Sequence, residues 1–93
     1  MSSETKIFTK SDYEQNTQII LRLPEVRSRS GLSRSTIYAY ISQGLWTKPV
    51  NLGPRAVGWP EDEVSKIIKA RIAGKEDEKI RELVIEMEAY RKK

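Results

Sequence analysis

The side chains best suited to chemistry in this sequence are the arginines and lysines in its middle third. Residues 19–59 carry six basic side chains against one acid, a net charge of +5, whereas residues 1–18 sum to −1 and residues 60–93 to zero. The six are Arg22, Arg27, Arg29, Arg34, Lys48 and Arg55. Positive charge gathered in one part of a small domain is typical of a protein that binds a polyanion, although a basic surface without a partner has the same composition.

The residue types that are missing exclude several kinds of chemistry. The 93 residues include no cysteine and no histidine, which excludes zinc fingers, disulfides and catalytic schemes built on an imidazole. The acids lie among lysines and arginines, as on solvated helix faces, and there is no glycine-rich phosphate loop. We therefore expect a protein that is not an enzyme and that uses no metal or cofactor. Without a membrane-spanning run or a signal-peptide pattern, we expect it in the cytoplasm. If the polyanion is DNA, we expect it to be associated with the nucleoid.

The pattern of apolar and polar residues divides the chain into three parts. Residues 1–18 are polar and predict a flexible N-terminal arm. Residues 19–73 predict the core domain, which opens on an apolar run, residues 19–23, expected to be a buried strand or an extended entry segment. Residues 74–93 predict an additional amphipathic helix.

Two short helices are predicted after this run. Pro24 suits the first turn of a helix that Gly31 ends in a left-handed conformation, and Ser33 caps a second helix over residues 34–43. Ile37 and Ile41 face inwards in that helix. The opposite face carries no acid–base pairs, and its residues are Ser35, Tyr38, Ala39 and Ser42, with Arg34 and Thr36 at the N-terminal end. Such side chains suit base edges and phosphates, while an ordinary polar helix face is the alternative.

A hairpin is predicted next, with strands over residues 46–50 and 56–59. Gly53 and Pro54 supply the turn, which places Arg55 near the tip and Lys48 on the first strand. A hairpin of this kind can cover a core or can reach DNA as a wing, and the arginine at its tip favours the wing.

Two amphipathic segments complete the chain. One begins at Glu61, and the expected inner face of this segment consists of Val64, Ile67, Ile68 and Ile72. The other covers residues 75–93, and its expected apolar side consists of Ile80, Leu83, Val84, Met87 and Tyr90. The second segment either folds back over the core or contacts a partner or a second copy of the chain.

Four segments in order resemble the AlpA-type prophage regulatory proteins, which are small DNA-binding proteins related to phage excisionases and more loosely to MerR-type heads. They are R-L-P-E-V at 22–26, G-L-S-R-S-T-I-Y at 31–38, K-P-V-N-L-G-P-R-A-V-G-W at 48–59 and E-D-E-V at 61–64. The resemblance covers about residues 19–73. It implies an α+β, mainly α fold: a small winged helix, with a helix-turn-helix and a β-hairpin wing, followed here by the C-terminal helix.

Two positions depart from the family pattern. Trp46-Thr47 stands where Phe-Pro is usual, and Ile67 stands where a tryptophan is common. We interpret both as changes in the core or in a turn that leave the DNA-facing side chains intact.

The resemblance implies a sequence-specific protein of a prophage or integrative element that binds double-stranded DNA. It implies an excisionase that bends attachment-site DNA and assists an integrase, a transcriptional regulator, or both. Self-association on DNA or through residues 75–93 is a further expectation, and a protein-interaction adaptor with weak DNA binding is the alternative function. The predicted DNA-binding residues are Arg27, Arg29, Ser33, Arg34, Ser35, Thr36, Tyr38, Lys48 and Arg55. For Tyr38 the alternative is a ring that rests on the hairpin, but its helical angle favours DNA.

Overall fold

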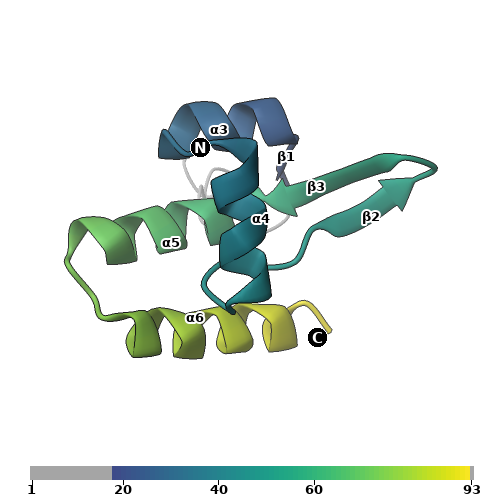
Figure 1. The fold of residues 1–93 in the computed structure, drawn as a ribbon. Coiled ribbons are helices and arrows are strands. Elements are labelled where there is room, and N and C mark those ends of the chain that lie inside the picture. The colour runs from purple at the N-terminus through teal and green to yellow at the C-terminus, as the bar shows by residue number, and fades with distance from the viewer. Residues whose placement is uncertain (1–17, 93) are drawn as a thin grey trace, which may run out of the picture.

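A helix pair, a three-stranded antiparallel sheet and two longer helices make up the computed structural model, which describes residues 18–92 (Figure 1). Nearly all of the predicted N-terminal arm lies outside these residues. The elements in chain order are β1 (Ile20–Leu21), α3 (Leu23–Ser30), α4 (Arg34–Ser42), β2 (Val50–Gly53), β3 (Ala56–Pro60), α5 (Glu61–Ile72) and α6 (Asp77–Tyr90). The predicted α+β, mainly α winged-helix architecture is confirmed.

The sheet has β3 at its centre, with β1 on one side and β2 on the other. Leu21 pairs with Trp59, so the apolar run at the start of the domain is a short strand, as one of the two expectations had it. Gly58 lies directly beneath this strand, and a Cβ there would come within 2.9 Å of the Leu21 carbonyl oxygen. The close approach of the β1 backbone to Gly58 therefore requires glycine at this position.

Local signals set the bounds of the helix pair as predicted. The Glu25 carboxylate accepts the Arg22 N–H at 2.9 Å, at the start of α3. Gly31 ends α3 with a φ of 75°, and its N–H donates to the Arg27 carbonyl at 2.8 Å. The Ser33 hydroxyl accepts the Thr36 N–H at 3.2 Å and caps α4. Three residues thus separate the two helices, which gives the pair a fixed, short turn.

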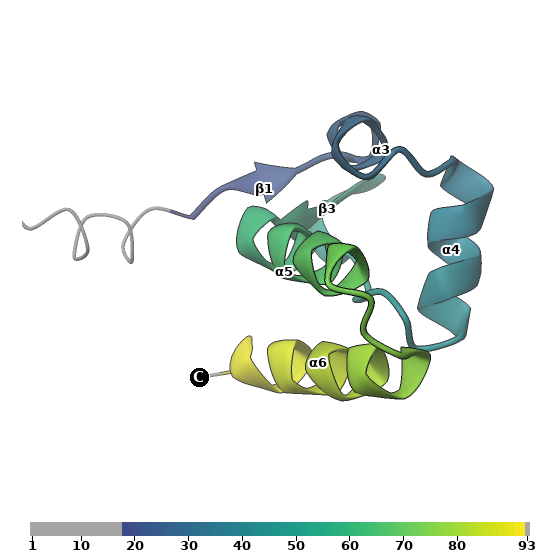
Figure 2. The same ribbon diagram turned by 90° about the vertical axis from the view of Figure 1, so that its left-hand side faces the viewer.

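One apolar core joins the sheet and the four helices described here. Its buried members are Leu21, Val26, Ile37, Leu45, Trp46, Trp59, Val64, Ile67, Ile80, Val84 and Met87. Trp46 and Ile67, the two departures from the family pattern, are core residues as interpreted. Three of the buried side chains come from α6, which lies beside α5 in both views (Figures 1 and 2). This apolar face of α6 covers the core, so a partner of α6 would have to contact its other side.

Two residues expected on inner helix faces are exposed instead. Ile72 is 80% exposed and Tyr90 is 71% exposed. Each is the last residue of its helix, where the helical period continues but no described element covers the side chain. The inner-face prediction was wrong for these two positions.

The first strand of the hairpin begins later than predicted. Trp46 and Thr47 are buried in the connection before β2, and the Thr47 carbonyl accepts the Trp59 Nε1–H at 2.9 Å. Pro49 has no N–H to contribute to a ladder, so strand pairing starts at Val50. Lys48 therefore precedes the wing and does not lie on its strand.

The hydroxyl of Thr47 offers a test of this packing. The residue is fully buried, and its Oγ1 has no hydrogen-bond partner among the described residues. An unpaired buried hydroxyl costs about 1–3 kcal/mol. We expect Thr47→Val to raise the free energy of unfolding in urea by about 1 kcal/mol, because it removes the hydroxyl and keeps the branched shape.

Thr47→Ser is the matched control for this experiment. It keeps the hydroxyl and removes the methyl group, and should lower the free energy of unfolding by about 1 kcal/mol. If the valine variant were the less stable of the two, the hydroxyl would have a partner that this packing does not provide.

Candidate nucleic-acid interface

The outer face of α4 is exposed to solvent and mostly polar. Ile37 is fully buried and anchors the helix, whereas Arg34, Ser35, Ala39 and Ser42 are exposed. In Figure 1, α4 stands in front of the domain between α5 and the hairpin. Because none of the four exposed side chains is large and apolar or acidic, another molecule can approach the α4 backbone closely.

Three predicted site residues meet at the N-terminus of α4. The Ser33 hydroxyl lies 3.0 Å from the Thr36 hydroxyl and 3.2 Å from the Ser35 hydroxyl. Hydroxyls can donate to a phosphate oxygen, and the positive end of the helix dipole favours an anion in the same place. This hydroxyl cluster is a suitable surface for one phosphate of a DNA backbone.

Tyr38 connects α4 to the sheet. Its ring meets the Trp59 ring edge to face, with centroids 6.3 Å apart and planes at 71°. The ring is half-buried and packs against the core, so it does not point away from it as its helical angle led us to expect. The Arg34 guanidinium carbon lies 5.2 Å from the centroid of the same ring. Tyr38 thus holds Arg34 on the face of α4 through a cation–π contact.

The hairpin extends from the domain beside α4 and carries Arg55 at its turn (Figure 1). Arg55 has a φ of 57° and is the one residue other than glycine with a positive φ among residues 18–92. A left-handed conformation costs a side-chain-bearing residue about 1 kcal/mol. Lys48 is exposed just before the hairpin begins, on the connection from α4.

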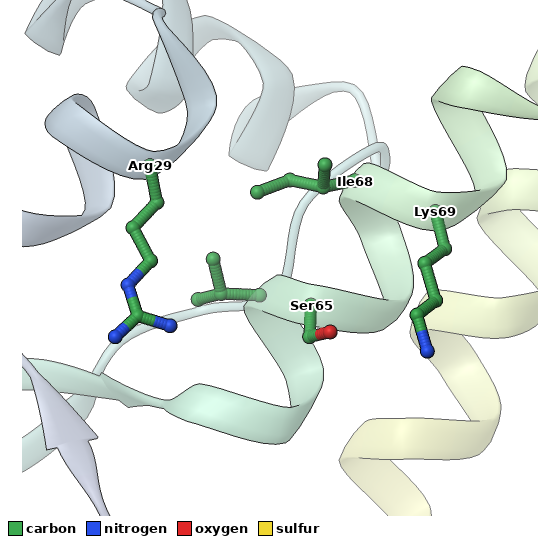
Figure 3. A pocket seen from close by; sticks show the side chains of 5 residues that line it. Arg29, Ser65, Ile68 and Lys69 are labelled. Carbon is green, nitrogen blue, oxygen red and sulfur yellow. The ribbon is translucent and has the colours of Figure 1, made fainter.

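The two arginines of α3 differ in their surroundings. Arg29 donates to the Glu61 carboxylate at 2.7 Å. Its side chain lines a groove of about 260 Å³ between α3 and α5, together with Ser65, Ile68 and Lys69 (Figure 3). This volume is below the range of about 300–1,000 Å³ usual for small-molecule sites. Arg27 is exposed and has no ion-pair partner among the described residues, so of the two it is the freer cation.

Sequence reasoning missed the side chains of α6 and of its C-cap residue, Arg91, that hold the connection leading into the hairpin. Arg81, Glu88 and Arg91 hydrogen-bond to backbone atoms of the connection between α4 and β2. Contacts to backbone atoms leave no pattern in the partner sequence. The sequence shows only that the three residues are charged, and charged residues are equally typical of a helix face that contacts solvent alone.

Within residues 18–92 no cluster of three or more acidic side chains could hold a metal ion. The helices described there are also too short or too polar to cross a membrane.

The geometry defines a winged helix-turn-helix protein: two helices joined by a three-residue turn, then a hairpin beside the second helix. Residues 19–72 match the family described as prophage CP4-57 regulatory protein (AlpA), and the chain belongs to this family. The match ends with α5, so α6 lies outside it.

Two curated relatives each match part of the chain. A protein of Enterobacteria phage P4, described as uncharacterized protein ORF88, is 47% identical over 55 residues, which is 59% of this chain and 62% of that protein. The DNA-binding transcriptional activator AlpA of Escherichia coli (strain K12) is 34% identical over 58 residues, 56% of this chain and 83% of that protein. The chain thus spans less than two thirds of the phage relative. No solved structure matches it.

The two contacts of the Tyr38 ring lead to a stability prediction. Tyr38→Phe keeps the ring against Trp59 and beneath Arg34, so the free energy of unfolding should change by less than about 0.5 kcal/mol. Tyr38→Ala removes the ring and should lower it by about 2 kcal/mol. Urea unfolding followed by tryptophan fluorescence measures both values. Equal losses in the two variants would mean that the hydroxyl, and not the ring, carries the stabilisation.

Proposed function

We propose that this protein is a sequence-specific DNA-binding protein of a prophage or integrative element. In this proposal α4 enters the major groove and the hairpin contacts the adjacent backbone. The observation that carries it is the placement of two exposed arginines, Arg34 on the outer face of α4 and Arg55 at the hairpin tip, on the two DNA-contacting elements of a winged helix-turn-helix. The protein performs no bond chemistry.

Arg34 recognises bases in the major groove, with Ser35, Thr36 and Tyr38 beside it. An arginine is the commonest side chain to recognise guanine, through O6 and N7. Because the Tyr38 ring already holds its guanidinium, Arg34 loses little conformational freedom on binding. The hydroxyls of Ser33, Ser35 and Thr36 suit phosphate contacts that fix the register of the helix.

Basic side chains around α4 position the protein on the duplex by contacting the DNA backbone. Arg55 contacts the backbone or minor groove from the wing. A glycine would adopt its left-handed conformation at lower cost, so an arginine at this position supports a role for the side chain. Arg27 and Lys48 supply further phosphate contacts. Arg29 contributes less, because a phosphate has to compete with the Glu61 carboxylate for its guanidinium.

The biological output of this DNA binding is excision, transcriptional regulation or both. The E. coli relative is described as a transcriptional activator, which supports regulation here. An excisionase would use the same surface to bend attachment-site DNA and to assist an integrase. Footprinting across the attachment site and the integrase promoter separates the two outputs: protection with bending at the attachment site supports excision, and protection of the promoter alone supports regulation.

The reading role of Arg34 is tested by alanine substitution. Arg34→Ala should weaken binding to the preferred duplex by about tenfold and reduce discrimination against mismatched duplexes. Lys66→Ala is the matched control, because it removes the same charge from an exposed residue of α5 that has no ion pair with a described residue. Equal retention of wild type and Arg34→Ala in a gel shift would remove Arg34 from the interface.

The wing is tested without disturbing its turn. Asparagine tolerates a left-handed conformation, so Arg55→Asn should leave the free energy of unfolding unchanged or raise it slightly. DNA binding should nevertheless weaken, and the slope of log Kd against log salt concentration should fall by about 0.9 for the lost phosphate contact. An unchanged slope would show that Arg55 does not contact the backbone.

A further inference from the structure

The helix α6 holds the chain at the point where the hairpin begins. We call residues 43–48, which connect α4 to β2, the wing root. The Arg81 Nε–H donates to the Gln43 carbonyl at 2.9 Å, at the start of the wing root. At its end, the Glu88 carboxylate accepts the Lys48 N–H at 2.8 Å, and the Arg91 Nη2–H donates to the Lys48 carbonyl at 2.7 Å. Two side chains of α6 and that of its C-cap residue, Arg91, thus bind both ends of the wing root.

A buried carboxylate orients the last of these side chains. Glu63 of α5 is 4% exposed and accepts from Arg91 at both oxygens, from Nε at 2.8 Å and from Nη2 at 2.7 Å. The hydrogen bond to Glu63 raises the pKa of Arg91 above its ordinary value, so the guanidinium stays charged. A two-point contact of this kind fixes the plane of the guanidinium and leaves it little rotamer freedom.

The wing root transmits this constraint to the hairpin. Pro49 alone separates Lys48 from β2, and a proline has a fixed φ. At the neighbouring residue, the Thr47 carbonyl is bound by Trp59 of β3. The direction in which the hairpin leaves the domain therefore depends on how the backbone of residues 47 and 48 is held, and α6 supplies the contacts at Lys48.

We infer that α6 sets the position of the wing relative to α4, and that Arg81, Glu88 and Arg91 are positioning residues that act on DNA binding through the wing-root backbone without touching DNA. The inference rests on the proposed function. It assigns a role in DNA binding to a helix outside the part of the chain that matches the family. It also differs from the adaptor hypothesis, in which α6 works by contacting another protein.

Two substitutions break this contact while the fold is kept. Glu88→Ala removes the acceptor for the Lys48 N–H and leaves no buried charge unpaired. Arg91→Lys keeps a positive charge beside Glu63, but an ammonium cannot span both carboxylate oxygens and the Lys48 carbonyl as the guanidinium fork does. Full removal of Arg91 is avoided, because it would leave the buried Glu63 carboxylate without a partner.

The readout is the affinity of the full chain for a labelled duplex selected from a random pool with the wild-type protein. We expect Glu88→Ala and Arg91→Lys each to weaken binding about fivefold, at a temperature where circular dichroism shows both variants folded. Glu86→Ala is the matched control: it removes the same charge from the same helix at an exposed residue. Removing an acid should by itself strengthen binding to DNA. If Glu88→Ala weakens binding and Glu86→Ala does not, the loss of affinity is therefore due to the contact with the wing root.

A double-mutant cycle with the wing decides between positioning and general stabilisation. If α6 acts through the wing, Arg55→Asn costs much less affinity in the Glu88→Ala background than in the wild type. Additive losses, or unchanged affinity in both α6 variants, would overturn the inference. If the wild-type protein binds no duplex, the proposed function is refuted. If Arg34→Ala weakens binding but Glu88→Ala and Arg91→Lys do not, only the role of α6 is refuted.

Discussion

The packing of Trp59 is the interaction on which the rest of this structure depends. The side chain is fully buried on the central strand, and its residue pairs with Leu21 of β1. Its indole N–H binds the Thr47 carbonyl before the hairpin, and its ring meets Tyr38 of α4. One aromatic residue therefore joins the sheet, the wing root and the proposed recognition helix. An indole suits this position because it combines a large apolar surface with a single donor that a backbone carbonyl can satisfy.

The electrostatics of the domain separate cations that stabilise the fold from cations that face solvent. Arg29 is paired with Glu61, and Arg91 is paired with the buried Glu63. Arg34 and Arg55 lie on the helix and the hairpin that a winged helix-turn-helix presents to DNA, and no described acid pairs with either. The net charge of +4 therefore understates how strongly positive the α4 and wing surface is. Acids concentrate instead at the start of α5 and along α6.

Much of the fold could be predicted because its signals are local. Gly31 and Ser33 act within one turn of the chain, and each is found in the predicted role. The predictions failed where a tertiary neighbour decides. The burial of Trp46 and Thr47 displaces the start of β2. Ile72 is exposed because none of the elements described within residues 18–92 covers it. Helical angle alone placed Tyr38 on the outer face, but the ring is large enough to reach Trp59 from there.

The sequence by itself determined the helix pair, the hairpin, the family and the excess of positive charge, because caps, turns, periodicity and composition are properties of neighbouring residues. Only the tertiary structure decided which cations are paired and what holds the wing. Glu63 and Arg91 lie 28 residues apart, and Lys48 and Arg91 lie 43 residues apart. These contacts form only when α6 folds back against the rest of the domain. Two of the three wing-root bonds go to the backbone N–H and carbonyl of Lys48, and every residue type except proline has both of these groups. No residue pattern encodes such a partner.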